Sequence, residues 1–178
     1  MENKRHLLGM TMEDFYGVVG ECGLPRFSAK QIADWVYKKR ITSIDEMTNL
    51  SVANRALLSE KYDIGRYNSL EFQQSVDGTV KYLFRTEKEK LIEAVMIPED
   101  DRATLCVSSQ VGCKMNCLFC MTGKQGFNGN LTANEILNQL YSVREAESLT
   151  NVVFMGMGEP LDNYANVIKS VELITSPE

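Results

Sequence analysis

The chain has 178 residues, of which 44% are hydrophobic and 24% are charged, and its formal net charge is −5. This composition is typical of a soluble globular protein, and no apolar run approaches the roughly 18 residues that a membrane span requires. Five cysteines, with three in one cluster, and a polar N-terminus unlike a signal peptide exclude a secreted disulfide framework and predict a reducing, cytoplasmic location.

Residues 1–66 are predicted to form a small all-helical unit without a catalytic signature. Serine and threonine residues that precede apolar-periodic segments are typical helix N-caps. Trp35 lies on the apolar stripe of the second helix, and we expect it to pack in the core. The expected helix starts are Thr11, Ser28, Ser43 and Ser51.

The charge of the chain is distributed unevenly. Residues 1–66 carry 10 Lys and Arg against 9 Asp and Glu, whereas residues 67–178 carry 9 against 15. We therefore expect RNA contacts, if the protein makes them, mainly on the first segment, where Arg26, Lys30 and Lys38–Arg40 concentrate positive charge. The alternative for the last group is that cations in a final helical turn complement the helix dipole.

Residues 67–100 are predicted to form three antiparallel strands. An Asp77-Gly78 turn between the first two alternating segments is a strong hairpin signal. In the third strand, residues 91–97, Glu93 shares a face with three apolar residues. A carboxylate on an apolar face is costly unless it is paired or protonated, so Glu93 is a candidate functional residue.

Residues 101–178 are predicted to contain two βα units. A strand over 104–107 precedes a cysteine-rich loop and a helix capped by Thr132. A second apolar strand, 151–155, precedes a glycine-rich loop and a helix over roughly 164–174. This order predicts a parallel sheet of the α/β class, with both loops at the carboxyl ends of the strands.

Cys113, Cys117 and Cys120 form a C-x3-C-x2-C cluster in the first loop. Three thiolates are one ligand short of a closed structural zinc site, whereas on a cubane iron–sulfur cluster they leave one iron open. Two alternatives remain at this point: a zinc site that borrows Cys106, or three unrelated buried thiols.

The second loop, Gly156-Met157-Gly158-Glu159, suits an amino-acid-like ligand. Its glycines allow close backbone approach, and Glu159 can receive an ammonium group. Because both loops project from the same edge of the sheet, such a ligand could chelate the open iron while Glu159 receives its amino group.

The spacing of the three cysteines, with Phe119 just before the last one, resembles the cluster motif of radical S-adenosylmethionine (SAM) enzymes. The Gly156–Glu159 loop resembles their methionine-binding motif. Over Thr104–Cys113 and Asn151–Leu161 the similarity extends to the RlmN/Cfr family of RNA adenine methyltransferases, and it covers essentially the whole chain.

This resemblance implies the start of a partial (βα)6 radical SAM barrel, of which two βα units are present, preceded by a β-hairpin/three-strand segment and a small helical domain. The expected domains are a helical accessory domain over 1–66, an antiparallel β segment over 67–100 and the first part of the barrel over 101–178. The implied cofactors are a [4Fe–4S] cluster on Cys113, Cys117 and Cys120, and SAM.

The resemblance also implies roles for further residues. Phe119 would lie beside the cofactor's adenine, and Gly156, Met157, Gly158 and Glu159 would hold its methionine part. Cys106 matches the family cysteine that resolves a covalent enzyme–RNA intermediate by forming a disulfide. Glu93 matches the glutamate proposed to handle the ring proton, a role for which a carboxylate with a raised pKa is suited.

The expected activity is methylation of C2 of an adenosine in 23S rRNA and in tRNA. The expected protein is monomeric, not bound to membranes, and reduced by a donor such as flavodoxin or ferredoxin. The family needs a further methyl-carrier cysteine, and this chain has none after Cys120. We therefore expect an inactive N-terminal fragment. The alternatives are a C8 methyltransferase of the Cfr type and a zinc-stabilised RNA-binding module.

Overall fold

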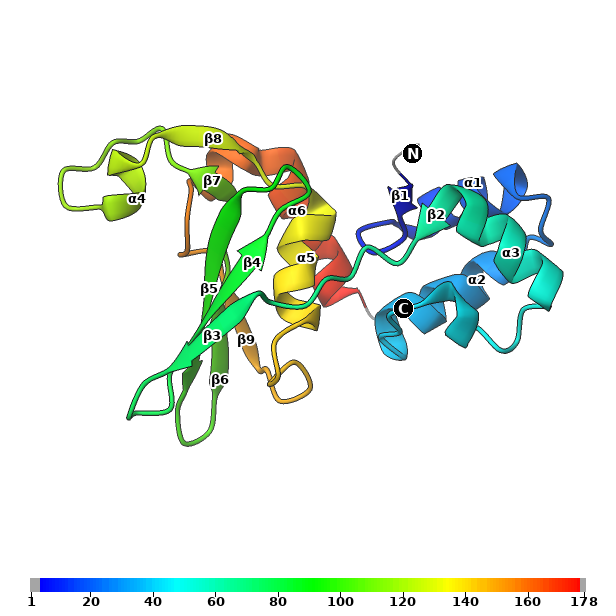
Figure 1. The fold of residues 1–178 in the computed structure, drawn as a ribbon, viewed down its shortest axis with the longest axis horizontal. Helices are drawn as coiled ribbons and strands as arrows, with labels where there is room; N and C mark the ends of the chain where they lie inside the picture. Colours follow the sequence, from blue (N-terminus) through cyan, green and yellow to red (C-terminus); the bar gives the residue numbers. More distant parts are fainter. Residues whose placement is uncertain (1–3, 177–178) are drawn as a thin grey trace. The chain divides into compact units, whose positions relative to one another are not determined.

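The computed structural model of the chain describes residues 4–176 and divides into two compact units, Met1–Arg66 and Tyr67–Glu178 (Figure 1). Within the described residues, each helix is too short or too polar to cross a membrane.

The first unit is mainly helical. A short parallel pair of two-residue strands, β1 and β2, joins its two ends, which the all-helical expectation did not include because two residues show no periodicity. Its elements are β1 (Arg5–His6), α1 (Met12–Glu21), α2 (Ser28–Ala33), a π-helical turn (Asp34–Lys38), a 3-10 turn (Ile44–Glu46), α3 (Val52–Lys61) and β2 (Tyr62–Asp63).

Three of the four expected helix caps in this unit are confirmed. The hydroxyls of Thr11, Ser43 and Ser51 each accept a hydrogen bond from a backbone N–H of the first helical turn. The expectation for Ser28 is wrong, because Ser28 is the buried first residue of α2 and the N-cap position is Phe27, which has no side-chain cap. Sequence spacing alone does not reveal that this hydroxyl is buried.

Trp35 also differs from expectation, because it is half-buried rather than part of the core. Trp35 lies in the π-helical turn, in which the Lys39 N–H donates to the Asp34 carbonyl over 3.0 Å. An i→i+5 turn shifts the following side chains off the 3.6-residue period. The Trp35 indole donates instead to Asn49 at the surface.

The second unit is built on a five-stranded sheet with the order β3-β4-β5-β6-β9. The first four strands are antiparallel, and β6 and β9 are parallel, with Leu105 opposite Val152. The expected hairpin turn is present, and Gly78 adopts φ +86° in it. The strands are β3 (Glu71–Gln74), β4 (Val80–Arg85), β5 (Leu91–Pro98), β6 (Ala103–Cys106) and β9 (Asn151–Val153).

Two helices follow β6 and β9 and complete the expected βα units. These are α5 (Ala133–Tyr141), which begins with the expected Thr132 capping box, and α6 (Tyr164–Thr175). Both contribute to the core on one face of the sheet (Figure 1). That core contains Tyr82, Phe84, Ile92, Ala94, Met96, Leu105, Ile136 and Leu140.

Glu93 shares a face with Leu91, Val95 and Ile97 as expected, but that face is not the buried one. The buried face of β5 is the one that carries Ile92, Ala94 and Met96, so Glu93 lies on the opposite face. Its side chain is 46% exposed and forms an ion pair with Lys81 of β4 over 3.1 Å. Alternation along a strand gives two faces, but it does not say which one the helices cover.

The cysteine loop is carried by a small hairpin that the sequence did not predict. Strands β7 (Gln110–Gly112) and β8 (Phe127–Asn130) pair antiparallel on either side of α4 (Met121–Lys124). Gly112 has φ +72°, and a Cβ atom there would lie 1.7 Å from the Gly126 carbonyl oxygen. The hairpin closes because Gly112 has no side chain to meet the Gly126 carbonyl.

Candidate functional site

The segments that follow β6 and β9 are joined by hydrogen bonds. The Gly156 N–H donates to the Val107 carbonyl over 3.0 Å. The N–H groups of Ser109 and Gln110 both donate to the Met157 carbonyl, over 2.9 and 3.1 Å. The segment leading to the cysteine loop and the glycine-rich loop therefore form one hydrogen-bonded junction at the carboxyl ends of the two parallel strands.

The two glycines of Gly156–Glu159 are needed for this junction. A Cβ atom at Gly156 would lie 2.7 Å from the Val107 carbonyl oxygen, and one at Gly158 would lie 2.5 Å from Cβ of Gln110. Gly158 also has φ +102°, which L side chains rarely adopt. The sequence suggested that these glycines let a ligand come close to the backbone. The structure shows that they also let the loop pack against the segment that contains Val107 and Gln110.

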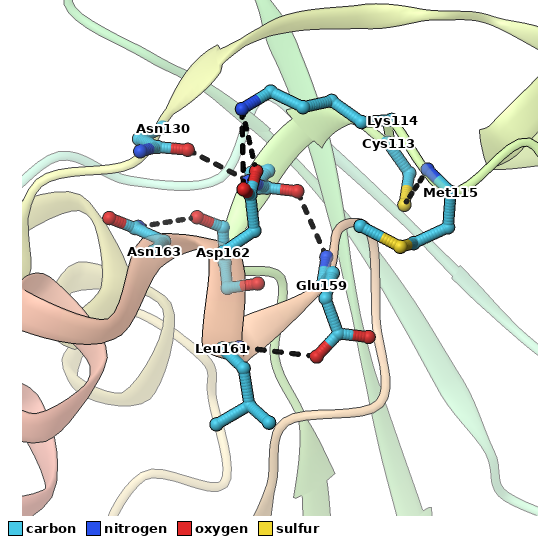
Figure 2. Close-up of polar contacts among 10 residues, drawn as sticks. Cys113, Lys114, Met115, Asn130, Glu159, Leu161, Asp162 and Asn163 are labelled. Carbon is cyan, nitrogen blue, oxygen red and sulfur yellow. Dashed lines mark hydrogen bonds and ion pairs between the residues drawn. The ribbon is translucent and has the colours of Figure 1, made fainter.

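Glu159 is fixed at its backbone and partly exposed at its side chain. Its N–H donates to Oε1 of Gln110 over 2.9 Å, and its carboxylate accepts from the Leu161 N–H over 3.2 Å. Figure 2 shows this carboxylate directed towards Leu161, at the start of the 3-10 turn Pro160–Asn163. One hydrogen bond leaves acceptor capacity for an ammonium group.

A cluster of polar side chains, Gln110, Lys114, Asn130 and Asp162, underlies the junction and is called the Gln110 cluster below. Gln110 is fully buried and donates to Asn130 and Asp162, each over 2.8 Å. Lys114 reaches Asp162 over 2.9 Å (Figure 2). Hydrogen bonds from Lys114 and then Gln110 lower the pKa of Asp162, so this carboxyl is ionised. Sequence reasoning missed these residues, because the burial of Gln110 and its contact with Asp162, 52 residues away, arise only from tertiary packing.

The three clustered cysteines differ in environment. Cys113 is buried at the base of the loop, where its sulfur accepts from the Met115 N–H over 3.4 Å (Figure 2). Cys117 is exposed, and its carbonyl accepts from the Cys120 N–H over 3.0 Å. A hydrogen bond from the Gly123 N–H is the largest of the effects that lower the pKa of the Cys120 thiol.

The donor set fits an iron–sulfur cluster in its chemistry, because three sulfur ligands lie on one short loop and the Cys120 environment favours the thiolate form that binds metal. Within residues 4–176, however, no three Cys, His, Asp or Glu side chains are close enough to one another to hold a metal ion.

Phe119 projects into solvent and is 92% exposed, as is Leu118. Exposed large apolar side chains on a functional loop are suited to cover a ligand. The exposed Phe119 is available to a bound molecule. The hydrogen-bonded junction places the two loops at the same end of the sheet.

Cys106 and Glu93 lie together on the face of the sheet opposite α5 and α6. Cys106 pairs with Val95 of β5 and Val153 of β9, and Glu93 is two residues from Val95 on the same face. Burial raises the pKa of the Cys106 thiol, partly offset by a hydrogen bond from the Met155 backbone. All five cysteines are free.

Two family models match the chain. Residues 5–64 match the ribosomal RNA large subunit methyltransferase N-terminal domain, and residues 107–177 match the radical SAM superfamily. The two matches lie within the two compact units.

The chain is similar to several proteins named probable dual-specificity RNA methyltransferase RlmN. It is 63% identical to that of Parabacteroides distasonis over 99% of this chain and 52% of the relative, and 46% identical to that of a Thermotoga species over 96% and 50%. The chain thus spans about half the length of the curated relatives it matches.

A crystal structure of a radical SAM methyltransferase from Sphaerobacter thermophilus superposes with a TM-score of 0.89 at 37% identity, over 97% of this chain and 52% of that chain. This match confirms the α/β fold class and the start of the partial barrel.

Proposed function

The chain belongs to the RlmN family of radical SAM RNA methyltransferases, and on that premise we propose that the whole protein methylates C2 of an adenosine in 23S rRNA and in tRNA. The relatives are named as RNA methyltransferases, which supports an RNA substrate. The observation that carries the proposal is the hydrogen-bonded junction of the Gly156–Glu159 loop with the segment that leads to the three cysteines.

This junction suits a reaction that needs two adjacent ligands. Adenine C2 is an unactivated aromatic carbon, so direct attack on a sulfonium methyl group is not feasible. A bound [4Fe–4S] cluster and SAM would supply one-electron radical chemistry able to activate a methyl group held on a cysteine.

The residues of the two loops would bind and orient the cofactors. Cys113, Cys117 and Cys120 would hold the cluster and leave one iron open. The Gly156–Glu159 loop would receive the amino-acid part of SAM, with the Glu159 carboxylate on its ammonium group. Phe119 would cover the adenine.

Cys106 and Glu93 would act on the RNA from the face of the sheet that the helices leave uncovered. Glu93 would take the ring proton, and Cys106 would then resolve the covalent intermediate by forming a disulfide with the methyl-carrier cysteine. Their shared face supports this division of roles. The exposure of Glu93 makes it accessible to a large substrate.

The remaining assignments follow the family and the charge distribution. Residues 1–66 would serve as an RNA-contacting accessory domain, residues 67–100 as an antiparallel β segment, and residues 101–178 as the first part of the barrel. A flavodoxin or ferredoxin would supply electrons to a monomer in the cytoplasm, where free cysteines persist.

Anaerobic reconstitution of the whole protein tests the proposal. We expect a brown protein with broad visible absorption, iron and sulfide, and formation of 5′-deoxyadenosine with SAM and a reductant. Mass spectrometry of the RNA should find 2-methyladenosine, whereas 8-methyladenosine would assign the alternative activity. A colourless protein with stoichiometric zinc would support the RNA-binding module instead.

A further inference from the structure

We propose that Gln110 is a positioning residue that sets the Gly156–Glu159 loop relative to the cysteine loop and thereby fixes the amino-acid part of SAM. The inference rests on the proposed function and goes beyond it, since Gln110 belongs to neither binding motif. It concerns the protein's own residues around the two loops and needs no contact between Gln110 and the cofactor.

The hydrogen bonds of Gln110 reach three separate segments. Its carbonyl oxygen Oε1 accepts from the Glu159 N–H over 2.9 Å. Its amide nitrogen donates to Asn130 of β8 and to Asp162 of the 3-10 turn, each over 2.8 Å. Both amide hydrogens and one acceptor site are used, and only a neutral amide of this length offers that set of groups.

The aliphatic part of Gln110 also packs against the backbone of the glycine-rich loop and so fixes its position. A Cβ atom at Gly158 would lie 2.5 Å from Cβ and 2.8 Å from Cγ of Gln110. The backbone of the loop therefore rests directly on this side chain. The next residue, Glu159, is held by the amide of the same side chain, so both packing and hydrogen bonding place the carboxylate.

Gln110 is coupled to the cysteine loop through two paths. It lies in β7, three residues before Cys113, and the β7–β8 hairpin carries the loop. Asp162, which accepts from Gln110, also forms the 2.9 Å ion pair with Lys114, the residue after Cys113. The Lys114 ammonium lies 4.4 Å from the centre of the Phe127 ring, which fixes its direction.

A positioning role explains why the chain keeps a buried polar group here. Buried polar networks cost desolvation and are often no more stabilising than apolar packing, but they specify one arrangement. The Gln110 cluster specifies the arrangement of the two loops that would share one ligand. Loss of the amide should therefore change ligand affinity without removing the cysteines' ability to bind iron.

The test substitutes Gln110→Glu in the whole protein, which places a carboxylate against the ionised Asp162. Iron and sulfide content should stay at the wild-type level. The dissociation constant of SAM, measured by equilibrium dialysis and by the change it causes in the electron paramagnetic resonance spectrum of the reduced cluster, should rise roughly tenfold to a hundredfold. The matched control is Gln74→Glu, at an exposed position of β3, which should bind SAM as the wild type does.

A second substitution distinguishes positioning from general destabilisation. In the double variant Gln110→Glu with Asp162→Asn, the carboxylate and the amide exchange places, so net charge is preserved and the new amide at position 162 can donate to the new carboxylate at position 110. Asn130 must turn its amide to donate to that carboxylate, and the ion pair between Lys114 and Asp162 is lost. SAM affinity should recover in part, to at least about threefold tighter than in Gln110→Glu, because the ion pair with Lys114 is still missing. Because Asp162→Asn also relieves the repulsion from the carboxylate at position 110, urea unfolding of both variants is measured beside SAM affinity. A loss of affinity in a variant of wild-type stability marks positioning, whereas affinity that only follows stability marks general destabilisation.

Three results would overturn the inference. The first is wild-type SAM affinity in Gln110→Glu with an intact cluster. The second is a loss of affinity that the double variant does not recover. If Gln110→Glu loses its cluster, Gln110→Asn replaces it as an uncharged, shorter amide, and unchanged SAM affinity there is the third. Failure of the wild type itself to bind SAM would instead reject the proposed function, and the inference with it.

Discussion

Glu93 and Cys106 are both only partly buried, and the property they share is one face of the sheet. Glu93 is half-exposed and paired with Lys81, so its carboxylate lies in an exposed ion pair and not in an apolar pocket. Cys106 lies diagonally across β5 and β6 on the same face. Residues diagonal across an antiparallel pair are roughly 7–8 Å apart, within reach of one nucleotide. The shared face therefore remains a reason to test both residues in the same reaction.

Glu93→Gln should stall turnover of the whole protein and accumulate a covalent RNA–protein adduct, because proton removal from the ring would be lost. Folding should change by less than about 1 kcal/mol, since the ion pair with Lys81 is exposed. Gel analysis of the adduct and urea unfolding measure the two effects. Lys81→Gln is the matched control, because it breaks the same ion pair and keeps the carboxylate. Normal turnover in Glu93→Gln would remove Glu93 from the mechanism.

Cys106 should react slowly with iodoacetamide in the metal-free chain at neutral pH. Its pKa is raised by burial, and only the thiolate is nucleophilic, so its rate should keep rising with pH beyond the point where a free thiol levels off. Mass spectrometry of peptides after timed alkylation gives the rate at each pH. The exposed Cys117 serves as the internal comparison. Equal rates at neutral pH would contradict the burial of Cys106.

At the scale of elements, the loops after β6 and β9 are constrained by each other as much as by any ligand. Gly156 lies against the Val107 carbonyl, and Gly158 lies against Gln110. A glycine-rich loop after a strand can thus serve chain packing and ligand approach at once. Adding a side chain at one of these glycines therefore tests the contact between the two loops, and an alanine substitution at a helical glycine with free space around it is the comparison.

Gly158→Ala should destabilise the second unit by about 1–3 kcal/mol, since it combines a left-handed φ with a clash against Gln110. It should also weaken SAM binding by moving Glu159. Gly17→Ala is the control, because it lies in α1 with nothing within 4 Å of the added Cβ atom. That change should stabilise the protein by about 0.5–1 kcal/mol. Urea unfolding of both variants checks the difference in sign, and a neutral Gly158→Ala would refute the packing argument.

Sequence patterns within a few residues predicted where helices and strands begin better than they predicted which side chains are buried. Thr11 and Thr132 cap helices as expected because a capping box depends only on residues of one turn. The solvent exposure of Glu93 depends on which face α5 and α6 cover, and the role of Gln110 depends on residues up to 52 positions away. Both arise from tertiary packing, which spacing along one strand does not contain. The cysteine and glycine motifs were readable because their ligand groups are consecutive in the chain.

At the scale of the whole molecule, positive charge and the proposed chemistry belong to different units. The first unit is slightly basic and the second is acidic. Two of the cations at the end of the second helix have partners within their unit: Lys38 pairs with Asp34, and the Lys39 ammonium lies 3.4 Å from the centre of the Trp35 ring. Arg26 and Lys30 are also exposed, and the Arg26 guanidinium lies 4.7 Å from the centre of the Tyr16 ring, so this pair tests the RNA contact at the start of the same helix.

Replacing Arg26 and Lys30 together with Gln should weaken RNA binding by the whole protein and flatten its salt dependence. Each lost phosphate contact should reduce the slope of log K against log salt by about 0.7–0.9, because fewer counterions are released. Filter binding of a ribosomal RNA fragment over a series of salt concentrations measures both quantities. Lys88→Gln with Lys90→Gln removes the same charge from exposed positions of the second unit and should leave the slope unchanged. An equal effect of the two pairs would show that RNA responds to net charge rather than to a surface on the first unit.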